Sequence, residues 1–134
     1  MNRWLAVLVV LAIAVPAVSA KDIGKCKLNV TQRQMVDEMN RTMKACVTTM
    51  DTLSECGRAS IDVQEFHNNE GLLPRIKSKE SAAYIEGKLR QSDGSAGTWR
   101  VVDKFDMSGK KSRFLEAYYT GDHYATFSLV NINR

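Results

Sequence analysis

The stretch VTQRQMVDEMNRTMKACVTTMDTL, residues 30–53, decides the fold, because its apolar side chains recur at steps of three and four. This spacing places them on one stripe of an α-helix. Thr31 is the expected N-cap, with Gln34 at the capping-box position, and Gly57 is a suitable end. The stripe comprises Met35, Val36, Met39, Met43, Cys46, Val47, Met50 and Leu53. We therefore expect a long amphipathic helix whose apolar face is covered by the rest of the chain.

The second half of the chain has the alternation of β-strands. Turn residues separate four candidate strands, at residues 84–89, 98–105, 113–119 and 123–132. Residues 61–66, between the helix and these strands, could form a short second helix. Short connections in chain order favour an antiparallel meander, which needs a cover on its apolar face. The sequence therefore predicts an α+β fold, with a long N-terminal amphipathic helix, continuous or broken, packed on a four-stranded antiparallel meander.

Three cysteines constrain this helix. A continuous helix would place Cys46 and Cys56 about 15 Å apart, whereas a disulfide needs Cα atoms within about 7 Å. A disulfide therefore requires the helix to break, most easily at residues 48–52, where threonines and Asp51 weaken helical propensity. We then expect a Cys46–Cys56 disulfide, which leaves Cys26 free and able to link two chains as a dimer.

The first twenty residues have the layout of a secretory signal peptide. Arg3 precedes an apolar run that Pro16 and a small-residue ending follow, so cleavage is expected between Ala20 and Lys21. The run is shorter than a membrane span, so no transmembrane anchor is expected. Residues 21–134 would then form a single secreted α+β domain. Two sequons predict N-glycosylation, at Asn29 and Asn40.

Catalytic and metal-binding motifs are absent from the sequence. The chain has two histidines, His67 and His123, and neither has the spacing of a metal ligand or of a catalytic pair. The net charge of +4 comes from interspersed signs, as in a solvated surface. The sequence therefore predicts a protein that is not an enzyme, requires no cofactor and binds no nucleic acid.

The hairpin at residues 114–127 resembles a signature of the lipocalins. In that family a strand ends in a Thr-Asp-Tyr-like turn and the next strand begins with Tyr-Ala, for which Thr120, Asp122, Tyr124 and Ala125 stand here. The sequence Gly97-Thr98-Trp99 resembles the lipocalin Gly-x-Trp motif. The resemblance covers the C-terminal strands and implies a calycin-like secreted protein that binds small molecules.

Two functions follow from these expectations. The first is a secreted non-enzymatic protein that holds a small apolar or amphipathic ligand between helix and sheet. Its ligand-binding residues would be Met39, Met43, Trp99, Tyr118 and Phe127. The alternative is a secreted interaction protein, such as an inhibitor, toxin or host-defence factor. It would act on a protein or membrane partner through its surface loops and the basic stretch at residues 75–79.

Overall fold

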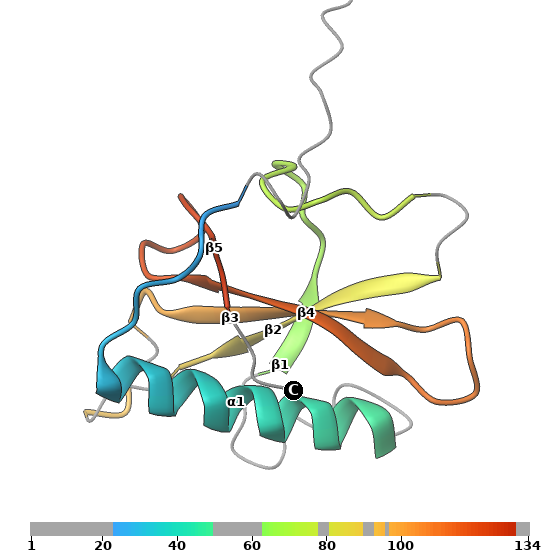
Figure 1. Ribbon diagram of the computed structural model, residues 1–134, viewed down its shortest axis with the longest axis horizontal. Coiled ribbons are helices and arrows are strands. Elements are labelled where there is room, and N and C mark those ends of the chain that lie inside the picture. The colour runs from blue at the N-terminus through green and yellow to red at the C-terminus, as the bar shows by residue number, and fades with distance from the viewer. Residues whose placement is uncertain (1–22, 50–62, 78–80, 90–92, 96, 131–134) are drawn as a thin grey trace, which may run out of the picture.

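The computed structural model describes residues 23–49, 63–77, 81–89, 93–95 and 97–130. Helix α1 (Val30–Thr49) lies across one face of a sheet, with loops over the other face (Figure 1). The sheet is antiparallel and its five strands follow chain order. The strands are β1 (Val63–Phe66), β2 (Ala82–Lys88), β3 (Arg100–Asp106), β4 (Arg113–Thr120) and β5 (Ser128–Leu129). The predicted α+β arrangement of a helix on an antiparallel meander is confirmed, but the sheet has five strands instead of four.

The N-terminus of α1 is capped by Asn29 and not by Thr31. The Asn29 Oδ1 atom accepts a hydrogen bond from the Gln32 backbone N–H at 2.8 Å. The Gln32 side chain accepts one in return from the Asn29 N–H at 3.1 Å. This reciprocal pair is a capping box two residues earlier than predicted. Asparagine caps at least as well as threonine, and the spacing to a glutamine is the same from either residue.

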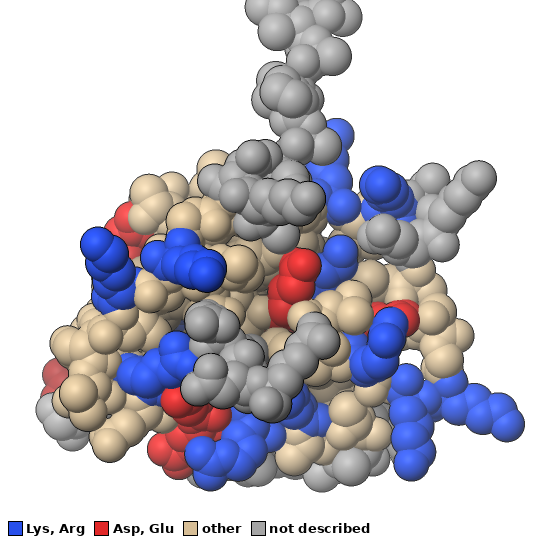
Figure 2. Space-filling model, viewed as in Figure 1, with Lys and Arg blue, Asp and Glu red and all other residues tan. Residues whose placement is uncertain are grey.

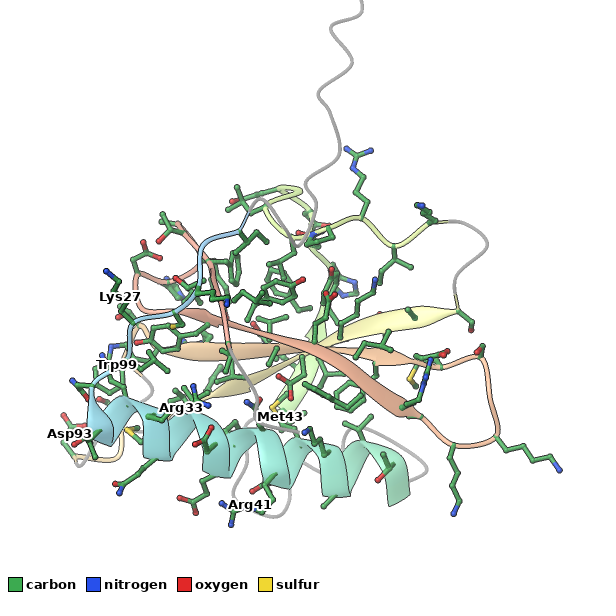
Figure 3. The ribbon with its side chains drawn as sticks, viewed as in Figure 1. Lys27, Arg33, Arg41, Met43, Asp93 and Trp99 are labelled. Carbon is green, nitrogen blue, oxygen red and sulfur yellow. The ribbon has the colours of Figure 1, made fainter. Side chains whose placement is uncertain are left out.

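Close packing between α1 and the sheet centres on Gly87 of β2. A Cβ atom at this glycine would lie 2.7 Å from the sulfur atoms of both Met39 and Met43. Met43 is fully buried and points from the helix toward the sheet (Figure 3). The methionine stripe therefore forms part of the core, and Gly87 is what allows it to approach the sheet.

Strand β1 replaces the short helix expected at residues 61–66. Val63 pairs with Gly87, and Phe66 pairs with Tyr84 on β2. A branched and an aromatic side chain favour a strand when a neighbouring strand is present to pair with. The neighbour, β2, is distant in the sequence, so the local pattern of residues 61–66 did not indicate a strand.

The last predicted strand, at residues 123–132, is wrong over its first half. His123 and Tyr124 have φ angles of 55° and 72°, in the left-handed region that interrupts a strand. Pairing with β4 is therefore confined to Ser128–Leu129. On its other side Leu129 forms a parallel bridge with Lys25, and the Cys26 N–H donates to the Leu129 carbonyl at 2.8 Å.

The two faces of the sheet have different partners. Val101 and Phe105 of β3 face α1, in buried clusters that include helix side chains. Tyr84, Val102 and Tyr118 face the opposite side, where Leu73 packs on them. No helix in the described part of the chain is long and apolar enough to cross a membrane. The polar residues described next belong to the face that α1 does not cover.

Candidate active site

A buried carboxylate lies on the sheet face that α1 leaves uncovered. Glu86 is 2% exposed, and β2 places it opposite Gln64 of β1. The Gln64 side-chain amide donates a hydrogen bond to Glu86 Oε1. The other oxygen, Oε2, is buried and has no hydrogen-bond partner among the described residues. A buried carboxylate oxygen without a donor is costly, and such a group commonly has a functional role.

A buried arginine begins the neighbouring strand on the same face. Arg100 is 5% exposed, and its Nη1 atom donates to the backbone carbonyls of Trp99 and Gly97 at 2.8 and 3.1 Å. Its Nε atom donates to the Tyr124 hydroxyl at 3.1 Å. These bonds fix the guanidinium group in the site, where it could bind a phosphate.

Tyr124 connects the arginine to the carboxylate. Its ring stacks on Phe66, with centroids 5.6 Å apart, and the Arg100 guanidinium carbon lies 5.7 Å from its centroid. Burial raises the pKa of Tyr124 to about 12, assisted by a hydrogen bond to Glu86 and by the charge of Glu86. The phenol therefore stays protonated at neutral pH, so it can accept from Arg100 and donate to Glu86.

The loop that carries Tyr124 is held by short polar bonds. Both Asp122 carboxylate oxygens accept hydrogen bonds from Thr126, and Oδ1 also accepts one from the Thr120 hydroxyl. These bonds keep the pKa of Asp122 below its usual range. The Tyr124 N–H donates to the Thr120 hydroxyl at 3.0 Å. The network maintains the positive φ angles of His123 and Tyr124, a costly conformation that is concentrated at functional sites.

Glu86 and Tyr124 line an open pocket with a volume of about 330 Å³, whereas Arg100, bonded to Tyr124, is not part of its lining. Loop residues that follow β1 form one wall, and the carboxylate, Tyr124 and Phe127 form the other. The lining consists of Gln64, Glu65, Phe66, His67, Asn68, Asn69, Glu70, Leu72, Glu86, Tyr124 and Phe127. No three His, Cys, Asp or Glu side chains gather as a metal site within the described ranges. The pocket therefore combines three glutamate carboxylates, an imidazole, amides and aromatic rings, and Tyr124 connects it to the fixed Arg100 guanidinium.

The five residues predicted to bind an apolar ligand do not converge. Met39 and Met43 pack on the helix side of the sheet. Tyr118 and Phe127 belong to the opposite face, and of these Phe127 lines the pocket. Trp99 packs in another cluster, toward the end of the sheet where the β2–β3 loop lies (Figure 3).

The sequons and cysteines are partly described. Asn40 is 3% exposed, and its amide donates to both Asp103 carboxylate oxygens at 2.7 and 3.0 Å, which argues against a glycan there in the folded protein. Asn29 is exposed but caps α1. Cys46 is disulfide-bonded and Cys26 is free. Burial raises the pKa of the Cys26 thiol, which disfavours oxidation to a dimer. Cys56 lies outside the described residues, so its pairing with Cys46 remains a prediction.

The chain belongs to the ribonuclease family, whose model, described as ribonuclease, matches residues 18–131. No curated protein matches the chain. Three predictions are thereby wrong: the lipocalin-like identity, the absence of enzyme activity and the absence of a nucleic-acid partner. Neither the non-enzymatic ligand-binding protein nor the surface-acting alternative is supported. A ribonuclease acts on RNA, and the buried carboxylate and guanidinium can now be interpreted with that substrate class in view.

Sequence reasoning missed Glu86 and Arg100. Each is a charged residue inside a predicted strand, at a position that alternates with apolar neighbours. Charged residues are seldom fully buried without a purpose, but alternation alone assigns them to a solvated face. The signal that could have revealed them is a carboxylate and a guanidinium on adjacent strands that both lie on the side away from the helix.

Proposed function

We propose that this protein cleaves RNA at the pocket lined by Glu86 and His67, beside Arg100, which is hydrogen-bonded to the lining residue Tyr124. The observation that carries the proposal is the buried Glu86 carboxylate, with one oxygen lacking a donor, beside a fixed arginine. The ribose 2′-hydroxyl is a hydrogen-bond donor and the phosphate is an acceptor for arginine. The site thus offers complementary groups to the two parts of RNA that must react.

The chemistry requires a base, an acid and a positive charge. Glu86 would remove the 2′-hydroxyl proton, and the 2′-oxygen would attack the neighbouring phosphorus. The bond from phosphorus to the 5′-oxygen then breaks, and this oxygen takes a proton from His67. Arg100 would stabilise the negative charge on the phosphate oxygens. The products are a 2′,3′-cyclic phosphate and a free 5′-hydroxyl.

Aromatic rings at the pocket could hold a base of the RNA. The rings of Phe66, Tyr124 and Phe127 pack on one another, with centroid distances of 5.6, 5.8 and 6.5 Å. Unstacked bases are commonly bound on such rings and read by neighbouring polar groups. The amides of Asn68 and Asn69 line the same pocket and could make those polar contacts.

We further propose that the enzyme is secreted as a single domain of residues 21–134. The support is the signal-peptide pattern of residues 1–20, which lie outside the described residues. A Cys46–Cys56 disulfide and a glycan at the exposed Asn29 would be consistent with export.

The test is cleavage of a labelled RNA oligonucleotide by the native protein and by Glu86→Gln. Loss of the base should reduce the rate by a factor of about 10² to 10⁴. The matched control is Glu116→Gln, on the same sheet face but hydrogen-bonded to Tyr118 outside the pocket. A DNA oligonucleotide of the same sequence should not be cleaved, because it lacks the 2′-hydroxyl. Equal rates for the native and Glu86→Gln proteins would contradict the assignment.

The proton donor is tested in the same assay with the two histidines. His67 lines the pocket and His123 does not; both are exposed, and the His123 ring is tilted against Tyr124 with centroids 4.9 Å apart. We expect His67→Ala to slow cleavage more than His123→Ala. The opposite order would assign the proton donor to His123.

A further inference from the structure

The two groups assigned to catalysis are both almost inaccessible. Glu86 is 2% exposed and Arg100 is 5% exposed. A base must come within hydrogen-bond reach of the proton that it removes. Part of the surrounding protein must therefore move before an RNA ribose and phosphate can contact both groups.

Tyr124 contacts both of these groups. Its hydroxyl accepts a hydrogen bond from Arg100 Nε at 3.1 Å, and it lines the same pocket as Glu86, whose carboxylate helps to raise the pKa of the phenol. A phenol hydroxyl and a ribose 2′-hydroxyl have the same capacity to donate one bond and accept others. The bonds of the phenol are thus the bonds that a bound ribose would make.

We propose that Tyr124 gates the active site, its hydroxyl occupying in the resting protein the position between Glu86 and Arg100 that an RNA ribose hydroxyl takes on binding. The inference rests on the proposed RNA-cleaving function. Because the substrate must displace the Tyr124 side chain, the resting enzyme is partly self-inhibited.

The backbone around Tyr124 is suited to such a movement. His123 and Tyr124 both have positive φ, which is unfavourable for residues with a Cβ atom. Residues 121–123, 125 and 126 are exposed. The resting conformation depends on a few bonds, including that from the Thr126 hydroxyl to Asp122 at 2.6 Å. Breaking these bonds would allow the loop to relax its backbone and withdraw the phenol.

The gate is tested with Tyr124→Phe, which keeps the ring on Phe66 but removes the hydroxyl. We expect tighter RNA binding and a higher kcat/KM, each by up to about tenfold, because substrate no longer competes with the phenol. Tyr118→Phe is the matched control: it removes another buried phenol hydroxyl, one bonded to Glu116, and should leave both quantities unchanged. Thermal unfolding of each variant checks that it is folded.

Binding is measured separately from cleavage, by fluorescence anisotropy with an oligonucleotide that carries 2′-O-methyl groups at all positions but one. The remaining position is the 3′-terminal ribose, which keeps its 2′-hydroxyl and ends in a 3′-phosphate, so the probe has no bond to a 5′-oxygen that could be cleaved there. If no protein cleaves RNA but Tyr124→Phe binds this probe more tightly than native protein, the gate stands and the cleavage proposal fails. If Tyr124→Phe cleaves more slowly, or binds and cleaves as the native protein does, the gate is refuted while cleavage stands.

A second variant covers the case in which Tyr124→Phe does not fold. Thr126→Val removes the hydroxyl bond to Asp122 and leaves Tyr124 intact, so it should loosen the loop and raise RNA affinity in the same direction. Unchanged affinity in a folded Thr126→Val protein would count against a gate carried by this loop.

Discussion

At the scale of single residues, Asp103 is a group whose ionisation the fold opposes. It is fully buried beneath α1, and burial raises its pKa well above the usual range, although the positive charge of Lys44 acts in the opposite direction. The Asn40 side-chain amide lies within hydrogen-bond distance of both of its oxygens. This pair explains why Asn40 is buried, and it makes the stability of the domain dependent on pH.

Asp103→Asn tests this dependence. Since the carboxyl pKa is higher in the folded than in the unfolded protein, the stability that Asp103 contributes is present below about pH 3.9 and is lost as pH rises toward the folded pKa. The loss is at most about 1.4 kcal/mol per pH unit. The Asp103→Asn side chain cannot ionise, and its amide oxygen can still accept a hydrogen bond from Asn40. Urea unfolding from pH 4 to 8 should therefore show the variant gaining stability relative to the native protein.

A constant difference between the two proteins across this range would contradict the raised pKa. A control is Asp106→Asn: its carboxyl is bonded to Ser108, which lowers its pKa. A lowered pKa changes stability only as the pH falls below about 3.9, so the difference between this variant and the native protein should stay constant from about pH 5 to 8.

Individual residues were predicted well where burial alone mattered. Met43 and Tyr118 were expected to be enclosed and are fully buried. Their assignment to one ligand site was wrong because they lie on opposite sides of the sheet. Alternation shows which residues share a face, but it does not show which face the helix covers. Which face the helix covers decides which of these residues form the core and which lie on the side of the candidate active site.

At the scale of elements, the start of α1 and the ends of strands β2 to β4 could be predicted within about two residues, because their periodicity is strong. The helix itself is shorter than the one expected to run toward Gly57: α1 ends at Thr49, and residues 50–62 lie outside the described residues. The start of the helix was predicted two residues too late, because the sequence indicated Thr31 as the N-cap in place of Asn29. Thr31 and Asn29 both precede a glutamine by three residues, and only geometry distinguishes them.

The cap can be verified by substitution in protein produced without glycosylation. Asn29→Ala should lower the free energy of unfolding by about 1 kcal/mol, since it leaves the first-turn N–H of Gln32 without its acceptor. Thr31→Ala should have a smaller effect, because Thr31 is exposed within the first turn. Chemical denaturation of both variants provides the comparison. A larger loss of unfolding free energy for Thr31→Ala than for Asn29→Ala would indicate that Thr31 is the N-cap.

The β4–β5 connection could not be predicted from local pattern. Alternating aromatic and small residues after residue 122 favour a strand, whereas the Asp122 network imposes left-handed angles at His123 and Tyr124. The Thr98 carbonyl, from another loop, accepts a bond from the His123 N–H. This conformation depends on contacts between distant segments, and it brings the Tyr124 hydroxyl into hydrogen-bond contact with Arg100.

At the scale of the whole molecule, positive charge is distributed unevenly. Figure 2 shows Lys and Arg side chains across the view with acidic ones between them, and a group of basic side chains at the lower right. The hairpin between β3 and β4 lies at that side and carries the exposed Lys110 and Lys111. A basic projection on an enzyme of this family is suited to contact RNA phosphates outside the pocket.

Replacing both lysines, Lys110→Gln with Lys111→Gln, should weaken binding of the non-cleavable RNA probe at low salt. If each lysine contacts one phosphate, the slope of log affinity against log salt should fall by about 1.4. Arg41→Gln is the control, because Arg41 points away from the sheet on the outer side of α1 (Figure 3). Equal salt dependence for the native and double-variant proteins would exclude the hairpin from RNA binding.

The bridge between Lys25 and Leu129 has a consequence for the order of folding. It joins a segment that precedes the helix to the last strand of the sheet, so its two halves are separated by nearly the whole described chain. Contacts between such distant segments carry a large loop-closure entropy and form slowly. During synthesis Leu129 emerges after every other strand. We therefore expect the sheet edge to close last, after translation of the preceding strands, with the N-terminal segment exposed until then.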